Sequence, residues 1–190
     1  TAMVAGEGHV VIPFASDLRK KLAAAHRGAF DAVLCMEVIE HVADTDGLHT
    51  EWAGDGVGVM LESAMRALKP GGILFLTTPN AVSITMLKHA LHLAPPMIYR
   101  PHVREYAPYE LDEIIRAAGF IIERRETLDV WRNAISVEEH KWISDFIAER
   151  GYPRELRGEN IFMLARKPGD PILETPKAEG FEAPFEKVIE

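Results

Sequence analysis

The sequence has one cysteine, no long apolar run and no excess of positive charge. A single cysteine, Cys35, excludes an internal disulfide framework and a cysteine-based zinc site, and it favours a reducing, cytoplasmic setting. Apolar runs such as Ile73–Leu76 are far shorter than the roughly 20 residues that span a bilayer. Lys and Arg total 21 against 29 Asp and Glu, and the net charge of −8 disfavours nucleic acid as a partner. The remaining composition, with 190 residues that are 47% hydrophobic and 26% charged, is typical of one globular domain.

Segments that are typical of strands alternate along the chain with segments that are typical of helices. Apolar runs predict strands at His9–Ala15, Phe30–Met36, Ile73–Thr77, Phe120–Ile122 and Ile161–Ala165. Amphipathic or helix-favouring stretches predict helices at Leu18–His26, Val57–Leu68, Pro108–Ala118 and from Ser136 to about Arg150. This alternation predicts an α/β fold, with a doubly wound, mostly parallel Rossmann-like sheet and helices on both of its faces.

Polar residues gather at the predicted strand ends, where sheets of this kind bind their ligands. Asp17 follows the first strand, and Thr78–Asn80 follow the third. Directly after the second strand come Glu37, Glu40 and His41. If that segment is helical, its i, i+3 and i+4 spacing brings two carboxylates and an imidazole to one face.

Three blocks of sequence resemble class I S-adenosylmethionine-dependent methyltransferases. In family order, the blocks are Phe30–Val42, Ala67–Leu74, and Pro101–Leu111 followed by Ala117–Phe120. The nearest subgroup is the ubiquinone-biosynthesis O-methyltransferases. The resemblance spans residues 9–166 and implies a methyltransferase domain over 1–166, with a substrate-cap insertion at 81–101. Residues 167–190, rich in Pro and Glu, are expected to form an extended tail.

The resemblance implies S-adenosylmethionine as the cofactor. By carry-over, Asp17 and Leu18 would hold the adenine, although an alternative alignment places Phe14 there, and Cys35 and Met36 would line the cofactor. The glycine-rich loop and second-strand carboxylate of the family have no clear counterpart before His9. We therefore interpret the sequence as N-terminally incomplete and expect the first two strands upstream. The glycine pattern at Gly54–Gly58 follows no apolar strand, so we interpret it as a lid or helix cap.

Methyl transfer requires alignment of an oxygen or nitrogen nucleophile and control of its proton. Glu37, Glu40, His41 and His102 would supply oxygen and nitrogen ligands for Mg²⁺, Mn²⁺ or Zn²⁺. A similar E-x-x-E-H with a later histidine occurs in small-RNA 3′-terminal 2′-O-methyltransferases, which supports a metal site. In the alternative without a metal, His41 is itself the general base. A structural interpretation also stays open, with Glu37 orienting the cofactor loop, Glu40 solvated and His41 packed on the core.

The apolar stretch Ile84–Tyr99 predicts a cap over an apolar substrate pocket. Its alternative is an interfacial helix that touches a membrane to collect a lipid-like substrate. The resemblance and these residues together predict methylation of an oxygen on a small or lipid-like molecule. An RNA 3′-terminal 2′-O-methyltransferase and a non-catalytic methyltransferase-like subunit are the alternatives. The sequence leaves the substrate's identity and the oligomeric state open.

Overall fold

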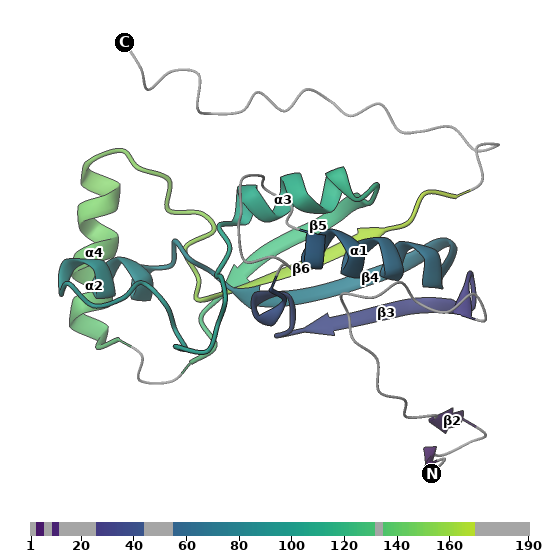
Figure 1. The fold of residues 1–190 in the computed structure, drawn as a ribbon. Helices are drawn as coiled ribbons and strands as arrows, with labels where there is room; N and C mark the ends of the chain where they lie inside the picture. The colour runs from purple at the N-terminus through teal and green to yellow at the C-terminus, as the bar shows by residue number, and fades with distance from the viewer. Residues whose placement is uncertain (1–2, 6–8, 12–25, 44–54, 132–134, 170–190) are drawn as a thin grey trace.

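The computed structural model describes residues 3–5, 9–11, 26–43, 55–131 and 135–169. Its main sheet contains β3 (Phe30–Met36), β4 (Leu68–Pro79), β5 (Ile121–Leu128) and β6 (Asn160–Arg166). The strand order is β3-β4-β6-β5, with β3 parallel to β4 and with β6 antiparallel to both of its neighbours (Figure 1). The expected α/β class and Rossmann-like sheet are confirmed, with one antiparallel strand inserted between the others.

Two helices cover one face of this sheet. They are α1 (Asp55–Ala67) and α3 (Pro108–Ala117), which lie on the same side of the strands in Figure 1. Their inward residues follow the predicted helical spacing: Val57, Met60 and Leu61 on α1, and Leu111, Ile114 and Ile115 on α3. They meet Leu74, Leu76, Met163 and other apolar side chains of the sheet in one core. Apolar periodicity therefore located both helices and the face that each one buries.

The opposite face of β3 is open in the part of the chain that the structure describes. Successive side chains of a strand point to opposite faces, so Leu34 and Met36 alternate with Cys35. Cys35 is buried under the helices, whereas Leu34 is 68% exposed and Met36 is 55% exposed. The carboxyl end of β3 thus presents an uncovered methionine side chain.

The described part of the first predicted strand, residues 9–11, does not join the main sheet. Residues of β2 (His9–Val11) pair antiparallel with β1 (Met3–Ala5) in a separate two-stranded sheet. The prediction that the His9–Ala15 strand belongs to the parallel sheet is therefore wrong for residues 9–11. Antiparallel pairing with the segment just upstream needs only a short connection, whereas parallel pairing needs a long crossover. Residues 12–25 lie outside the described part of the chain.

The remaining helices, α2 (Ile84–Leu91) and α4 (Val137–Glu149), pack on each other beyond the carboxyl ends of β3 and β4 (Figure 1). Ile84, Ile143 and Ile147 form an apolar cluster separate from the main core. The Ser136 side chain accepts the backbone N–H of Glu139 at 3.2 Å and caps α4, so the predicted start of this helix at Ser136 is confirmed. The α2 helix of the insertion thus packs on α4 and not under the sheet.

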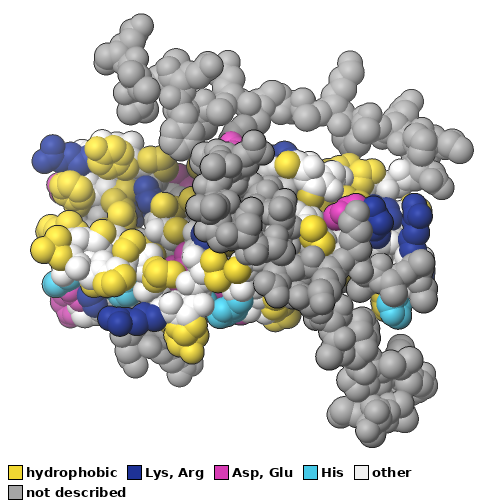
Figure 2. Space-filling model, viewed as in Figure 1, with side chains coloured by type: hydrophobic (Ala, Val, Ile, Leu, Met, Phe, Trp, Pro, Cys, Tyr) yellow, Lys and Arg dark blue, Asp and Glu magenta, His cyan; other side chains and the backbone are white. Residues whose placement is uncertain are grey.

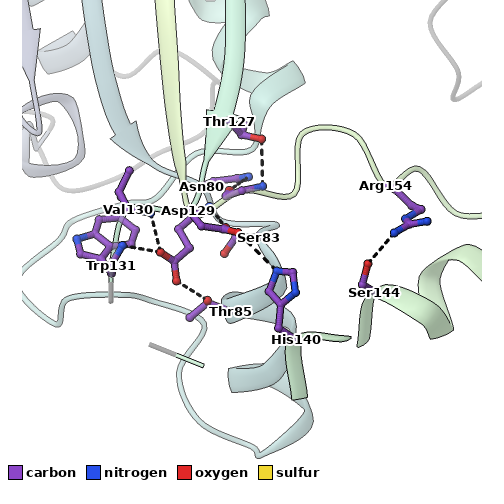
Figure 3. A network of polar contacts seen from close by, with 12 residues as sticks. Asn80, Ser83, Thr85, Thr127, Asp129, Val130, Trp131, His140, Ser144 and Arg154 are labelled. Carbon is purple, nitrogen blue, oxygen red and sulfur yellow. Dashed lines mark hydrogen bonds and ion pairs between the residues drawn. The ribbon is translucent and has the colours of Figure 1, made fainter. Parts of the chain in front are cut away.

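One buried carboxylate ties α2 to the sheet. Oε1 of Glu159 accepts the Thr85 hydroxyl at 2.8 Å. Its Oε2 accepts the backbone N–H groups of Val130 at 3.0 Å and Trp131 at 2.7 Å, so both oxygens are satisfied. Figure 3 shows Thr85, Val130 and Trp131 converging in this way at the ends of the strands. Helix α2 is therefore held against the segments that follow β5 and precede β6.

Gly158 lies where this junction leaves no room for a side chain. A Cβ atom there would come within 2.5 Å of the Leu128 nitrogen and 2.7 Å of the Thr127 carbonyl carbon. We expect Gly158→Ala to lower the free energy of unfolding by about 2 kcal/mol, as overpacking does. The control is Gly58→Ala within α1, where a Cβ meets nothing within 4 Å and helix propensity should add about 0.5–1 kcal/mol. Urea unfolding measures both; equal midpoints for the two variants would contradict the assignment.

Candidate metal centre and active site

Three of the four predicted metal ligands lie together. Glu40 and His41 belong to the short 3-10 helix η2 (Ile39–His41) that follows β3, and His102 lies in the loop before α3. One ligand atom from each residue lies within 4.8 Å of the other two. The imidazole rings of His41 and His102 meet edge to face, with their centroids 4.7 Å apart. Two segments distant in sequence therefore supply a carboxylate and two imidazoles to one place.

Glu40 has the environment of a cation ligand. Its side chain is fully buried, and Oε2 accepts the Thr78 hydroxyl at 2.9 Å. Its other oxygen, Oε1, is buried with no hydrogen-bond partner in the described residues. Burial raises the pKa of the Glu40 carboxyl above its usual range. Because a buried, unpaired carboxylate oxygen is costly unless a cation or proton meets it, these residues fit a divalent ion. The interpretation of Glu40 as solvated is wrong.

His41 stays accessible beside this carboxylate. Its side chain is 44% exposed, so the alternative in which His41 packs on the core is also wrong. Nε2 of His41 lies 4.0 Å from Oε1 of Glu40. The backbone carbonyl of Glu40 accepts the N–H of Val103 at 2.8 Å and that of Arg104 at 3.3 Å, which fastens the loop carrying His102. Glu40 thus contributes a carboxylate to the cluster with His41 and His102, and its backbone carbonyl holds the loop that brings His102 there.

Glu37 faces other partners. Its Oε1 accepts the Thr77 hydroxyl at 2.7 Å and the Asn160 side-chain amide at 2.8 Å, and Glu37 is not part of the three-residue group. Its φ of 53° is in the left-handed region, which non-glycine residues adopt rarely and often at functional sites. Thr77 and Asn160 were missed by sequence reasoning, because their meeting with Glu37 depends on the strand order β3-β4-β6.

Among the predicted cofactor residues, the structure describes Cys35 and Met36, whereas Asp17 and Leu18 lie outside the described residues. Cys35 is buried in the core, and this burial raises the pKa of its thiol to about 12, which makes the thiol a poor nucleophile. Met36 presents its exposed side chain at the end of β3. Gly56 and Gly58 lie in the first turn of α1, so the interpretation of the glycine pattern as a lid is wrong for these two residues, and the pattern instead belongs to the start of a helix. Gly54 lies outside the described residues.

The chain matches a known family. Residues 5–124 match the family model for a methyltransferase domain, and the chain belongs to that family. It is 30% identical over 136 residues to the ubiquinone biosynthesis O-methyltransferase of Xanthomonas axonopodis pv. citri (strain 306). That match covers 67% of this chain but 51% of the relative, so the chain spans about half the length of that relative.

Two solved structures show the same fold at low identity. A SAM-dependent methyltransferase from Thermotoga maritima, described as a possible histamine N-methyltransferase, matches with a TM-score of 0.50 and 17% identity, covering 79% of this chain and 61% of that one. A SAM-dependent methyltransferase from Methanosarcina mazei matches with a TM-score of 0.50 and 13% identity, covering 82% of this chain and 66% of that one. Both support the α/β methyltransferase fold.

Single substitutions decide between the four-ligand set that the sequence predicts and the three-ligand group of the structure. We expect Glu40→Ala, His41→Ala and His102→Ala each to weaken Zn²⁺ binding by about 100-fold or more, because each removes a ligand atom. Glu37→Ala should change the affinity by less than about threefold, since its carboxylate binds Thr77 and Asn160. Isothermal titration with ZnCl₂ measures all four. A loss for Glu37→Ala equal to the others would restore the four-ligand set.

Proposed function

We propose that this protein transfers a methyl group from S-adenosylmethionine to a hydroxyl oxygen of a small or lipid-like molecule. The observation that carries the proposal is the convergence of Glu40, His41 and His102 at the carboxyl edge of the sheet of a methyltransferase-family domain. In open α/β sheets that edge is where ligands bind. The name of the Xanthomonas relative, an O-methyltransferase of ubiquinone biosynthesis, supports oxygen as the methyl acceptor.

The cofactor, when bound, supplies an electrophilic methyl group. The residues of this chain then have to place the acceptor oxygen in line with that methyl group and manage its proton. Met36 has an exposed apolar side chain at the end of β3, which would contact the cofactor. Glu37 follows the same strand, and its carboxylate accepts hydrogen bonds from Thr77 and Asn160. Asp17 and Leu18 remain the predicted adenine contacts.

A divalent ion bound by Glu40, His41 and His102 would act as a Lewis acid and lower the pKa of a substrate hydroxyl. Two imidazoles and one carboxylate suit Zn²⁺ or Mn²⁺, and Mg²⁺ less well, because Mg²⁺ prefers oxygen ligands. The unpartnered Oε1 of Glu40 is the atom that such an ion would satisfy. This set of ligands favours the metal route.

The second route needs no metal. His41 is accessible, and the carboxylate of Glu40 lies 4.0 Å from its Nε2. His41 would then take the hydroxyl proton of the substrate directly, and chelation would have no effect on the reaction.

The insertion at 81–101 is proposed to cover the substrate. Helices α2 and α4 lie beyond the strand ends, and apolar side chains are spread over that end of the molecule in Figure 2. Exposed members include Leu91, Leu93, Trp142 and Phe146. A cap of this kind suits an apolar substrate, with peripheral membrane contact as the alternative. Within the described residues, no helix is long and apolar enough to cross a membrane.

Cofactor binding and chelation together test the function. We expect the full-length protein, with the strands expected upstream of this sequence, to bind S-adenosylhomocysteine in isothermal titration and to transfer labelled methyl groups from S-adenosylmethionine to members of a panel of phenols. EDTA should abolish transfer and added Zn²⁺ or Mn²⁺ should restore it, because the ion replaces a general base. Activity that persists in EDTA and is lost in His41→Ala would favour the second route. Absent cofactor binding would support a non-catalytic subunit, and transfer to RNA 3′ ends but not to phenols would support the RNA alternative.

If the insertion covers the substrate, a substitution that loosens it should change the KM for the substrate without changing the affinity for the cofactor. Glu159→Ala leaves three donors unpaired and loosens α2, so we expect the KM for a phenol to rise about tenfold, which corresponds to about 1.4 kcal/mol. The affinity for S-adenosylhomocysteine should stay within about twofold. Glu138→Ala, at an exposed position of α4, is the control and should alter neither quantity. Equal loss of both affinities in Glu159→Ala would show that the insertion is part of the core.

A further inference from the structure

Glu105 lies behind His102 as a buried carboxylate. Its side chain is 2% exposed, and that of His102 is 6% exposed. Oε1 of Glu105 lies 2.9 Å from Nδ1 of His102 and accepts the backbone N–H of Ile98 at 2.6 Å. A carboxylate only accepts hydrogen bonds, so Nδ1 of His102 is the nitrogen that carries the proton. The unprotonated nitrogen of the neutral ring is then Nε2.

We propose that Glu105 is a positioning residue that holds His102 in the Nδ1–H tautomer, so that Nε2 is its metal-ligating atom. The inference rests on the proposed function in taking His102 as a ligand. A carboxylate that accepts the N–H of a ligating histidine fixes its tautomer and ring orientation and increases its basicity. Glu105 thus prepares His102 for a cation before any ion binds.

The surroundings of His102 fix the ring further. Its backbone N–H donates to the carbonyl of Tyr99 at 3.0 Å, and the Tyr99 ring meets the imidazole edge to face at 5.4 Å. Ile98 and Tyr99 belong to the insertion at 81–101, in the part that follows α2. Because Glu105 binds both Ile98 and His102, one carboxylate links the proposed cap to the proposed ligand.

The cost of burying Glu105 favours this role over a purely structural one. Its Oε2 is buried with no hydrogen-bond partner in the described residues, as is Oε1 of Glu40. An incompletely satisfied carboxylate is an expensive way to anchor one backbone N–H. The carboxylates of Glu105 and Glu40 both lie close to the His102 ring, where a bound cation would balance their charge.

The test compares Glu105→Ala and Glu105→Gln with the wild type. Two-bond ¹H–¹⁵N spectra of the histidine rings, recorded at pH 8 on the metal-free chain, report the tautomer of His102. We expect Nδ1–H in the wild type and in Glu105→Gln, whose amide oxygen still accepts, and a shift toward Nε2–H in Glu105→Ala. Titration with ZnCl₂ should show an affinity about 10–100-fold lower for Glu105→Ala, and a smaller loss for Glu105→Gln.

Asp112→Asn is the matched control. Asp112 is another buried carboxylate with an unpartnered oxygen, but it lies on α3 and pairs with Arg125 and Arg116. The Asp112→Asn variant should have a lower melting temperature but the same His102 tautomer and the same zinc affinity as the wild type. The inference is overturned if wild-type His102 is Nε2–H, or if Glu105→Ala loses stability while keeping both tautomer and affinity. If the wild type binds no zinc, the metal route fails, whereas a tautomer shift in Glu105→Ala would still support the positioning role.

Discussion

The burial of one carboxylate, Glu40, organises the candidate active site. Its backbone carbonyl holds the loop of Val103 and Arg104, and Thr78 on β4 donates to one of its oxygens. The other oxygen points to no donor in the described residues and lies near His41. Removing such a group from water is unfavourable without a compensating cation or proton. The fold therefore maintains, beside two histidines, a charge that a ligand would have to balance.

Comparison with Glu159 shows what is unusual about Glu40. Both carboxylates are buried near strand ends, yet Glu159 receives three hydrogen bonds and leaves no oxygen unpaired. Glu159 is satisfied by the protein itself and serves to hold α2 in place. Glu40 is satisfied on one side only. Glu40 therefore keeps one oxygen that a cation or proton can meet, beside His41 and His102.

The site also depends on parts of the chain that pack separately. Helices α1 and α3 build the main core and fix the sheet, whereas α2 and α4 form their own apolar cluster beyond the strand ends. Glu105 connects the two regions, since it binds Ile98 of the insertion and His102 of the site. A movement of the proposed cap would therefore displace the proposed ligand His102, because Oε1 of Glu105 binds both Ile98 and His102.

The sequence by itself determined the local elements and indicated three of the residues that gather at the candidate site, Glu40, His41 and His102. Apolar spacing located α1 and α3, Ser136 marked the start of α4, and Glu40 and His41 were marked by their place after β3, because these signals act between near neighbours in the chain. Tertiary structure decided the rest. It paired His9–Val11 with Met3–Ala5, inserted β6 antiparallel, engaged Glu37 with Thr77 and Asn160, and set Glu105 behind His102. Strand order and long-range hydrogen bonds have no local periodicity, so only the folded chain could reveal them.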